Sequence, residues 1–98
     1  MPKRVEFGPV VTFNNVYADK EQAVKILEEA AEVFVAWQQR SANVDPENDP
    51  AAVSDILDEC CDVVQAVANL CAALGKYDMT AKMQNCKQRN INRGRIKF

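Results

Sequence analysis

The stretch that decides the fold is ILDECCDVVQAVANL, residues 56–70. At roughly 100° per residue, its apolar side chains form one stripe along a helix. Glu59 projects into the middle of this stripe, and Asp62 lies one turn further along, at its edge. An ionised carboxylate aimed at a core is costly unless a positive charge meets it. This helix contains no Lys or Arg, so the missing positive charge is the main clue in the chain.

A second acidic pair lies upstream, in ILEEAAEV at residues 26–33. Glu29 and Glu32 are three residues apart, with Glu28 beside them, on the side of the helix opposite its apolar face. Two helices that each offer an acidic pair across one interface form a pocket of four carboxylates. Mg²⁺ or Mn²⁺ prefers such oxygen ligands. The chain has no histidine and no cysteine spacing typical of zinc, which argues against a softer metal.

Composition limits the classes of protein that the chain can belong to. Its 98 residues predict one domain, 1–98, whose core is modest enough that self-association would help it. From Lys82 to Phe98 there are six cations and no acid, a pattern suited to phosphate groups. The remainder is too acidic for a dedicated nucleic-acid binder. The four cysteines show no disulfide spacing, and Cys60 and Cys71 are interpreted as small core residues.

The sequence also carries expectations about location. The first residues lack the apolar run of a signal peptide, and no segment is long enough to cross a bilayer. We therefore expect a cytoplasmic protein that does not insert into membranes.

Helix-capping and helix-breaking residues along the chain predict three helices. Residues 1–18 are expected to form an extended arm, because Gly8-Pro9 breaks the chain and one short β-prone run cannot stand alone. Asp19 is expected to cap a helix over about 20–40, and the polar segment 41–50 is expected to be a loop. A second helix should run from about 51 to 74 and stop at Gly75, and Asp78 should cap a third beginning near Met79. The prediction is an all-α bundle, with a helical core over 19–93 completed by oligomerisation and a basic tail over 94–98.

These motifs resemble a known family. Glu28-Glu29-x-x-Glu32, followed after a loop by Glu59-x-x-Asp62, is similar to the paired motifs of the MazG-like, all-α nucleoside triphosphate pyrophosphohydrolases. Asn69 resembles an asparagine of the dimeric dUTPases in the same superfamily. Lys87-x-x-Asn90-x-x-Arg93-Gly94 looks like the run that ends many short MazG-like chains. The resemblance covers about residues 20–95 and leaves out the N-terminal arm.

The resemblance implies an activity and a set of roles. The activity is hydrolysis of an NTP or dNTP to the monophosphate and pyrophosphate, by a homodimer or homotetramer. The implied roles are metal ligation by one group of residues, proton acceptance from water by Glu28, and substrate binding by another group. The metal ligands would be Glu29, Glu32, Glu59 and Asp62, and the substrate-binding residues would be Asn69, Lys87, Asn90 and Arg93.

Two alternatives remain open at the level of sequence. Phosphoribosyl-ATP pyrophosphohydrolase shares the metals and the bond type. A non-catalytic helical module is the alternative from another class, and in it Glu59 would pair with a cation from the third helix or from a neighbouring subunit, such as Lys82 or Arg89. A metal-dependent rise in melting temperature would separate this module from a four-carboxylate site.

Overall fold

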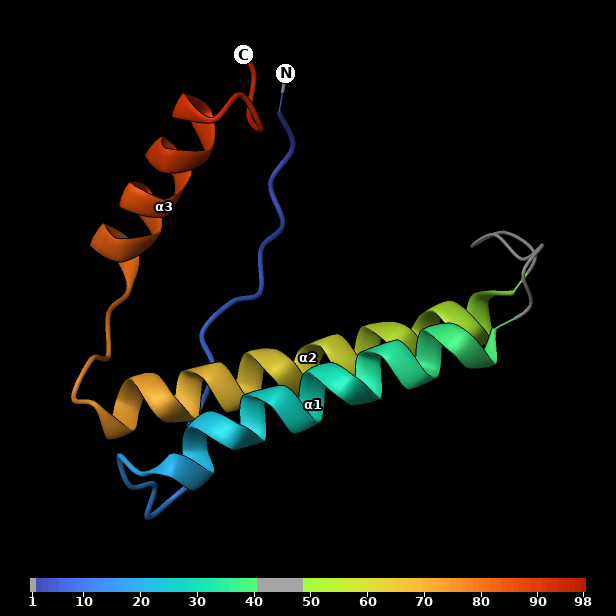
Figure 1. Ribbon diagram of the computed structural model, residues 1–98, viewed down its shortest axis with the longest axis horizontal. Coiled ribbons are helices and arrows are strands. Elements are labelled where there is room, and N and C mark those ends of the chain that lie inside the picture. Colours follow the sequence, from blue (N-terminus) through green and yellow to red (C-terminus); the bar gives the residue numbers. More distant parts are fainter. Residues whose placement is uncertain (1, 41–48) are drawn as a thin grey trace.

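The computed structural model describes residues 2–40 and 49–98, and within these ranges the regular secondary structure is entirely α-helical. The helices are α1 (Lys20–Gln39), α2 (Pro50–Ala73) and α3 (Thr80–Asn92). α1 and α2 lie side by side and antiparallel as a long hairpin, as Figure 1 shows. The predicted all-α class is therefore confirmed, with helix bounds close to those expected. The predicted loop over 41–50 falls, at 41–48, outside the described residues.

The helices begin at polar caps that the sequence supplies. The Asp19 carboxylate accepts a hydrogen bond of 3.0 Å from the backbone N–H of Gln22, which satisfies one of the free donors of the first turn of α1. Asp49 does the same for α2, whose first residue is Pro50. α3 begins one residue later than expected: Asp78 accepts from the N–H of Thr80 at 2.9 Å, and Met79 occupies the cap position.

Two glycines end helices as the sequence predicts. At the end of α2, Gly75 has a φ of +78°, its N–H donates to the Ala72 carbonyl, and the next N–H donates to the Cys71 carbonyl. This pair of bonds is a Schellman motif, which needs a left-handed residue that glycine adopts without strain. Gly94 ends α3 with the same pair of bonds at a φ of +74°.

Neither α2 nor α3 is long and apolar enough to cross a membrane, and the same holds for α1.

The core of the hairpin is thin. Among residues 2–40 and 49–98, the only buried apolar side chains are Ala66 and Ala72, both on α2. The expected apolar face of α1 is packed only in part: Ile26 and Val33 are half-buried, whereas Ala30 and Trp37 are exposed. Small side chains let the two helix backbones approach closely, but they bury little apolar area. One chain therefore has little hydrophobic stabilisation of its own.

The apolar face of α1 is wider than the part that α2 covers. Leu27 is 71% exposed, Phe34 is 60% exposed and Trp37 is 52% exposed. The Arg40 guanidinium lies 3.6 Å from the centre of the Trp37 ring, so Trp37 is not in the core of this chain. A stripe of large apolar side chains on α1 is therefore exposed in the described part of the chain.

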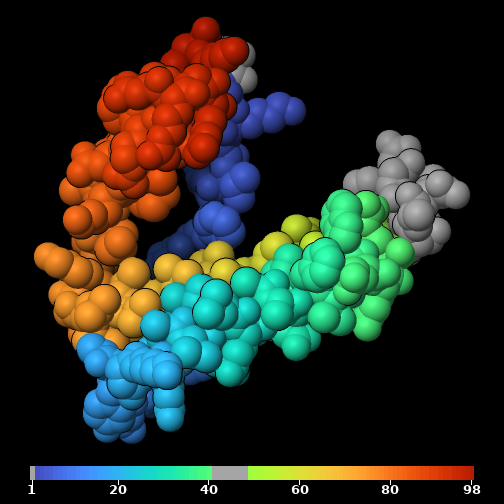
Figure 2. Space-filling model, viewed as in Figure 1, coloured from blue at the N-terminus to red at the C-terminus, as the bar shows by residue number. Residues whose placement is uncertain are grey.

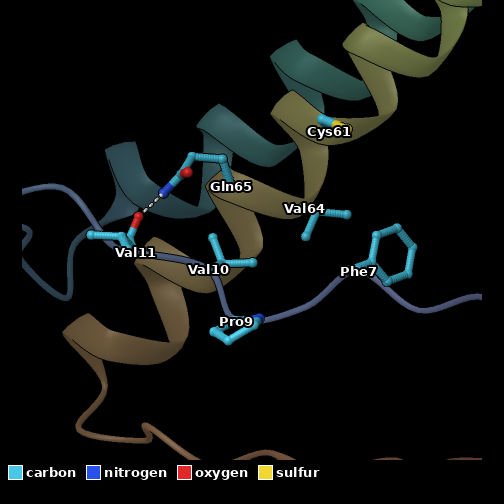
Figure 3. A pocket seen from close by; sticks show the side chains of 7 residues that line it. All are labelled: Phe7, Pro9, Val10, Val11, Cys61, Val64 and Gln65. Carbon is cyan, nitrogen blue, oxygen red and sulfur yellow. Dashed lines mark hydrogen bonds between the residues drawn. The ribbon is translucent and has the colours of Figure 1, made fainter.

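The N-terminal arm has no regular secondary structure, as expected, and it contacts α2 within residues 7–13, while its first residues lead away from the hairpin (Figure 1). The close view in Figure 3 shows Phe7 and Val10 of the arm beside Val64, where they line a cavity of about 290 Å³. The side-chain amide of Gln65 donates a 2.9 Å hydrogen bond to the carbonyl of Val11, which joins the arm to the helix through its backbone. A contact of this kind depends weakly on which side chains the arm carries.

α3 stands away from the hairpin. Figure 2 shows it separated from α1 and α2, to which the turn after Gly75 connects it. Packing between helices in the described part of the chain is confined to α1 and α2. The thin apolar seam of α3 is consequently open, with Met83 60% exposed. Within the described residues, α3 thus makes no packing contact with the hairpin of α1 and α2.

Candidate functional site

Three carboxylates from two helices converge on one point. Glu29 comes from α1, and Glu59 and Asp62 come from one face of α2. One carboxylate oxygen from each lies within 4.8 Å of those of the other two. Glu29 and Glu59 are half-buried, and Asp62 is exposed. Pairs at i, i+3 share a face, which explains the position of Asp62 beside Glu59. We call Glu29, Glu59 and Asp62 the acidic triad. The expectation that Glu29 lies opposite the apolar face of α1 was wrong: it is half-buried on the same side as Ile26 and Val33, where α1 packs on α2.

Glu59 is the member of the triad whose pKa is raised by its surroundings. Desolvation raises its pKa above the ordinary value of 4.5, and the nearby charges of Asp62, Glu32 and Glu29 raise it further, with a last contribution from Asp58. Each of these effects disfavours the ionised form. Within residues 2–40 and 49–98, no ion pair within 4.0 Å relieves Glu59. Glu59 itself therefore has no cationic partner among the described residues.

Lys25 places a positive charge beside Glu29, another member of the triad. Its Nζ lies 3.2 Å from Oε1 of Glu29 and 3.5 Å from Oε2 of Glu28. The hydrogen bond and the charge of Glu29, followed by those of Glu28, raise the pKa of Lys25. Sequence analysis missed this residue, although its i, i+3 and i, i+4 spacing to the two glutamates was a usable signal.

The other two glutamates of α1 lie outside the triad. Glu32 is exposed and is not among the three residues whose oxygens meet, although its charge contributes to the raised pKa of Glu59. Glu28, the expected proton acceptor, is also exposed and lies beside the triad, paired with Lys25. The structure thus brings together three of the four expected metal ligands.

A cleft of about 200 Å³ opens next to the triad. Its wall combines charged, amide and apolar groups from three parts of the chain: Phe13 of the arm, Lys25 and Glu29 of α1, and Asp62, Gln65, Ala66 and Asn69 of α2. Asn69 is 4% exposed, and its Oδ1 accepts hydrogen bonds from the N–H of Phe13 at 3.0 Å and from Nε2 of Gln65 at 3.1 Å. Asn69, expected to bind substrate, holds the arm at the edge of this cleft.

The remaining expected substrate-binding residues are not at this cleft. Lys87 and Asn90 lie on α3, and Arg93 caps its end, while α3 packs against neither helix of the hairpin. They interact locally instead: Asn90 donates to the Cys86 carbonyl at 3.0 Å and accepts from Nη1 of Arg95 at 3.4 Å. Within one described chain, the structure does not bring the basic run together with the acidic triad.

Comparison with protein-family models, with curated proteins and with solved structures gives no match for this chain. The interpretation of the site therefore depends on its own chemistry. The triad offers oxygen ligands only, and hard divalent cations favour carboxylate oxygens at close range. The donor set of the triad is therefore of the kind that could hold a hard divalent cation.

The raised pKa of Glu59 predicts a pH dependence of stability. Its pKa is higher in the folded than in the unfolded chain, so its protonation favours folding below the ordinary value of 4.5. This contribution is lost as the pH rises through the folded-state pKa. We expect the melting temperature of wild type minus that of Glu59→Gln, measured without divalent cations, to fall as the pH rises above the ordinary value of 4.5. A difference that rises or stays constant as the pH rises would show that folding does not raise the pKa of Glu59.

Proposed function

We propose that the protein is a Mg²⁺-dependent nucleoside triphosphate pyrophosphohydrolase, which converts an NTP or dNTP to the monophosphate and pyrophosphate. The observation that carries this proposal is the acidic triad, in which Glu59 has like charges around it and no cationic partner among the described residues. A divalent cation would neutralise the triad and would supply charge stabilisation to the phosphate oxygens. The resemblance of the two acidic motifs to the MazG-like enzymes supports the same reaction.

The roles of the residues follow from their positions. Glu29, Glu59 and Asp62 would hold the metal, and Glu32, whose charge acts on Glu59, would be the fourth ligand. Water attacks the α-phosphorus, the bond from that phosphorus to the bridging oxygen breaks, and pyrophosphate leaves. The proton of the water passes to Glu28, which lies beside the triad. Its Oε2 is 3.5 Å from Nζ of Lys25.

The protein works as a homodimer or homotetramer in this proposal. The hairpin helices α1 and α2 carry eight acids and two bases, whereas residues 80–98 carry six bases and no acid. In one chain these oppositely charged parts do not pack together, and the stripe of Leu27, Phe34 and Trp37 is uncovered. Association of two copies would cover that stripe and would allow the basic run of one copy to approach the acidic hairpin of the other. Lys87, Asn90 and Arg93 then serve the partner's site.

A substrate panel tests the proposed reaction. With Mg²⁺ present, the protein is incubated separately with each NTP, each dNTP and phosphoribosyl-ATP, and release of monophosphate and pyrophosphate is followed. We expect turnover of at least one NTP or dNTP, and loss of that turnover when the divalent cation is chelated. Turnover of phosphoribosyl-ATP alone would assign the protein to histidine biosynthesis. Absence of all turnover would contradict the proposal.

A non-catalytic oligomerisation module is the second candidate. The position of α3 favours it, because the expected phosphate-binding residues lie away from the acidic triad in the chain. Metal linkage distinguishes the two candidates. A carboxylate site should raise the melting temperature in millimolar Mg²⁺ or Mn²⁺, by an amount that grows with the logarithm of the metal concentration. A module without a metal site should show no such rise beyond that caused by an equal ionic strength of NaCl.

A further inference from the structure

The cleft beside the acidic triad has an aromatic wall that comes from outside the helices. Phe13 belongs to the arm, which is separated from α2 by more than thirty residues of chain, yet it lines the same cleft as Glu29 and Asp62. Its side chain is 63% exposed. An aromatic ring that borders a cleft of charged groups has a face available for a flat apolar ligand group.

The hydrogen bonds of the arm fix Phe13 at this cleft. Its N–H donates to the buried Oδ1 of Asn69 at 3.0 Å, and two residues earlier the Val11 carbonyl accepts from Gln65 at 2.9 Å. Gln65 also donates to Asn69 at 3.1 Å, so one connected set of bonds holds the arm on α2. Preorganisation of this kind lowers the entropy that binding must overcome. Phe13 is exposed, but its backbone is anchored.

The same bonds determine which atom of the Asn69 amide has no hydrogen-bond partner. Because Oδ1 already accepts two hydrogen bonds, the amide orientation is set and Nδ2 points away from both donors. Nδ2 donates no hydrogen bond within residues 2–40 and 49–98, although the side chain is only 4% exposed and lines the cleft. No fully buried side-chain nitrogen or oxygen in the described residues lacks a partner, so Nδ2 reaches solvent and is free to donate to water or to a ligand.

These groups describe one class of ligand. The cleft combines carboxylates for a metal, the ammonium of Lys25, an amide donor and the ring of Phe13. We propose that Phe13 stacks on the nucleobase of the substrate, so that the N-terminal arm forms the base-binding wall of the site. The inference rests on the proposed function for the position of the triphosphate at the triad. It adds a residue and a segment to which the resemblance assigns no role.

Phe13→Ala tests this inference against a matched arm variant. The full-length protein with Mg²⁺ is titrated with a nucleoside triphosphate whose α–β bridge is a methylene group, and separately with inorganic tripolyphosphate, which has no base. Stacking on an aromatic side chain corresponds to roughly 5- to 150-fold in affinity. We expect Phe13→Ala to weaken binding of the nucleotide analogue within that range and to change tripolyphosphate binding less than about twofold, and we expect Phe13→Trp to restore nucleotide binding.

Phe7→Ala is the control, because Phe7 belongs to the same arm and is equally exposed, at 63%, but does not line this cleft. Its nucleotide affinity should equal that of wild type. Equal nucleotide affinity of Phe13→Ala and wild type overturns the inference, and so does an equal loss of nucleotide and tripolyphosphate binding. Wild type that binds the analogue but hydrolyses no natural triphosphate refutes the proposed function while the stacking result stands. Wild type that does not bind the analogue at all overturns both.

Discussion

Glu59→Gln is expected to lower kcat/KM for Mg²⁺-dependent triphosphate hydrolysis by about 10²- to 10³-fold. Glutamine keeps the length of the side chain and one oxygen but removes the charge that would bind the metal. The same change should leave the melting temperature of the metal-free protein at neutral pH unchanged or higher, because it removes a carboxylate that is partly desolvated and repelled by its neighbours. Loss of activity together with equal or greater stability separates a functional role from a structural one.

Asp55→Asn is the matched control for this variant. Asp55 lies on α2, one turn before Glu59, and is exposed and outside the triad. Asp55→Asn removes one negative charge from α2, as Glu59→Gln does, so a general effect of net charge should appear equally in both variants. We expect Asp55→Asn to retain activity within about twofold, as for a surface substitution. Comparable losses in Asp55→Asn and Glu59→Gln would mean that the triad has no special role.

Phe34→Asp is expected to disrupt the proposed self-association and to leave the protein monomeric. Leu27 and Phe34 are seven residues apart on α1, so they project from nearly the same face, and both are mostly exposed in one chain. A charge in the centre of an apolar interface should cost at least about 2 kcal/mol, which corresponds to roughly a 30-fold rise in the dissociation constant. Sedimentation equilibrium at several protein concentrations measures this constant directly.

Val5→Asp controls for the added charge, because Val5 is 78% exposed but belongs to the arm and not to the stripe on α1. It should leave the oligomeric state unchanged. Wild type that remains monomeric at every accessible concentration would contradict the proposed association. If the basic run of one copy serves the site of another, Phe34→Asp should also lose activity, and activity should recover as its concentration is raised.

The helices could be predicted because their signals are local. Asp19, Pro50 and Gly75 fix the ends of α1 and α2 through bonds within a few residues. The inward direction of Glu59 was also predictable, since a carboxylate in an apolar stripe must face the neighbouring helix. In these cases the period of the helix determines which side chains share a face, and packing of one helix on the other follows. The side of α1 that carries Glu29 was not predictable, because the packed side of α1 includes Glu29 and leaves Trp37 exposed.

The features that sequence analysis missed depend on contacts between distant segments. Asn69 was expected to bind substrate, but its Oδ1 binds the backbone of an arm 56 residues away, and no local pattern announces that contact. The wide exposure of Phe34 and Trp37 was not evident either, because periodicity shows that a face is apolar and not what covers it. The direction of α3 depends on the short turn after Gly75, which has no periodic pattern.

Binding of Mn²⁺ is the most direct test of the metal site. The fraction of free Mn²⁺ is measured by electron paramagnetic resonance at neutral pH while wild type, Glu59→Gln and Asp55→Asn are each titrated into the metal. The acidic triad predicts saturable binding by wild type and by Asp55→Asn, and weak or no binding by Glu59→Gln. A free Mn²⁺ signal that wild type leaves unchanged, or equal binding by wild type and Glu59→Gln, would contradict a metal site at these carboxylates.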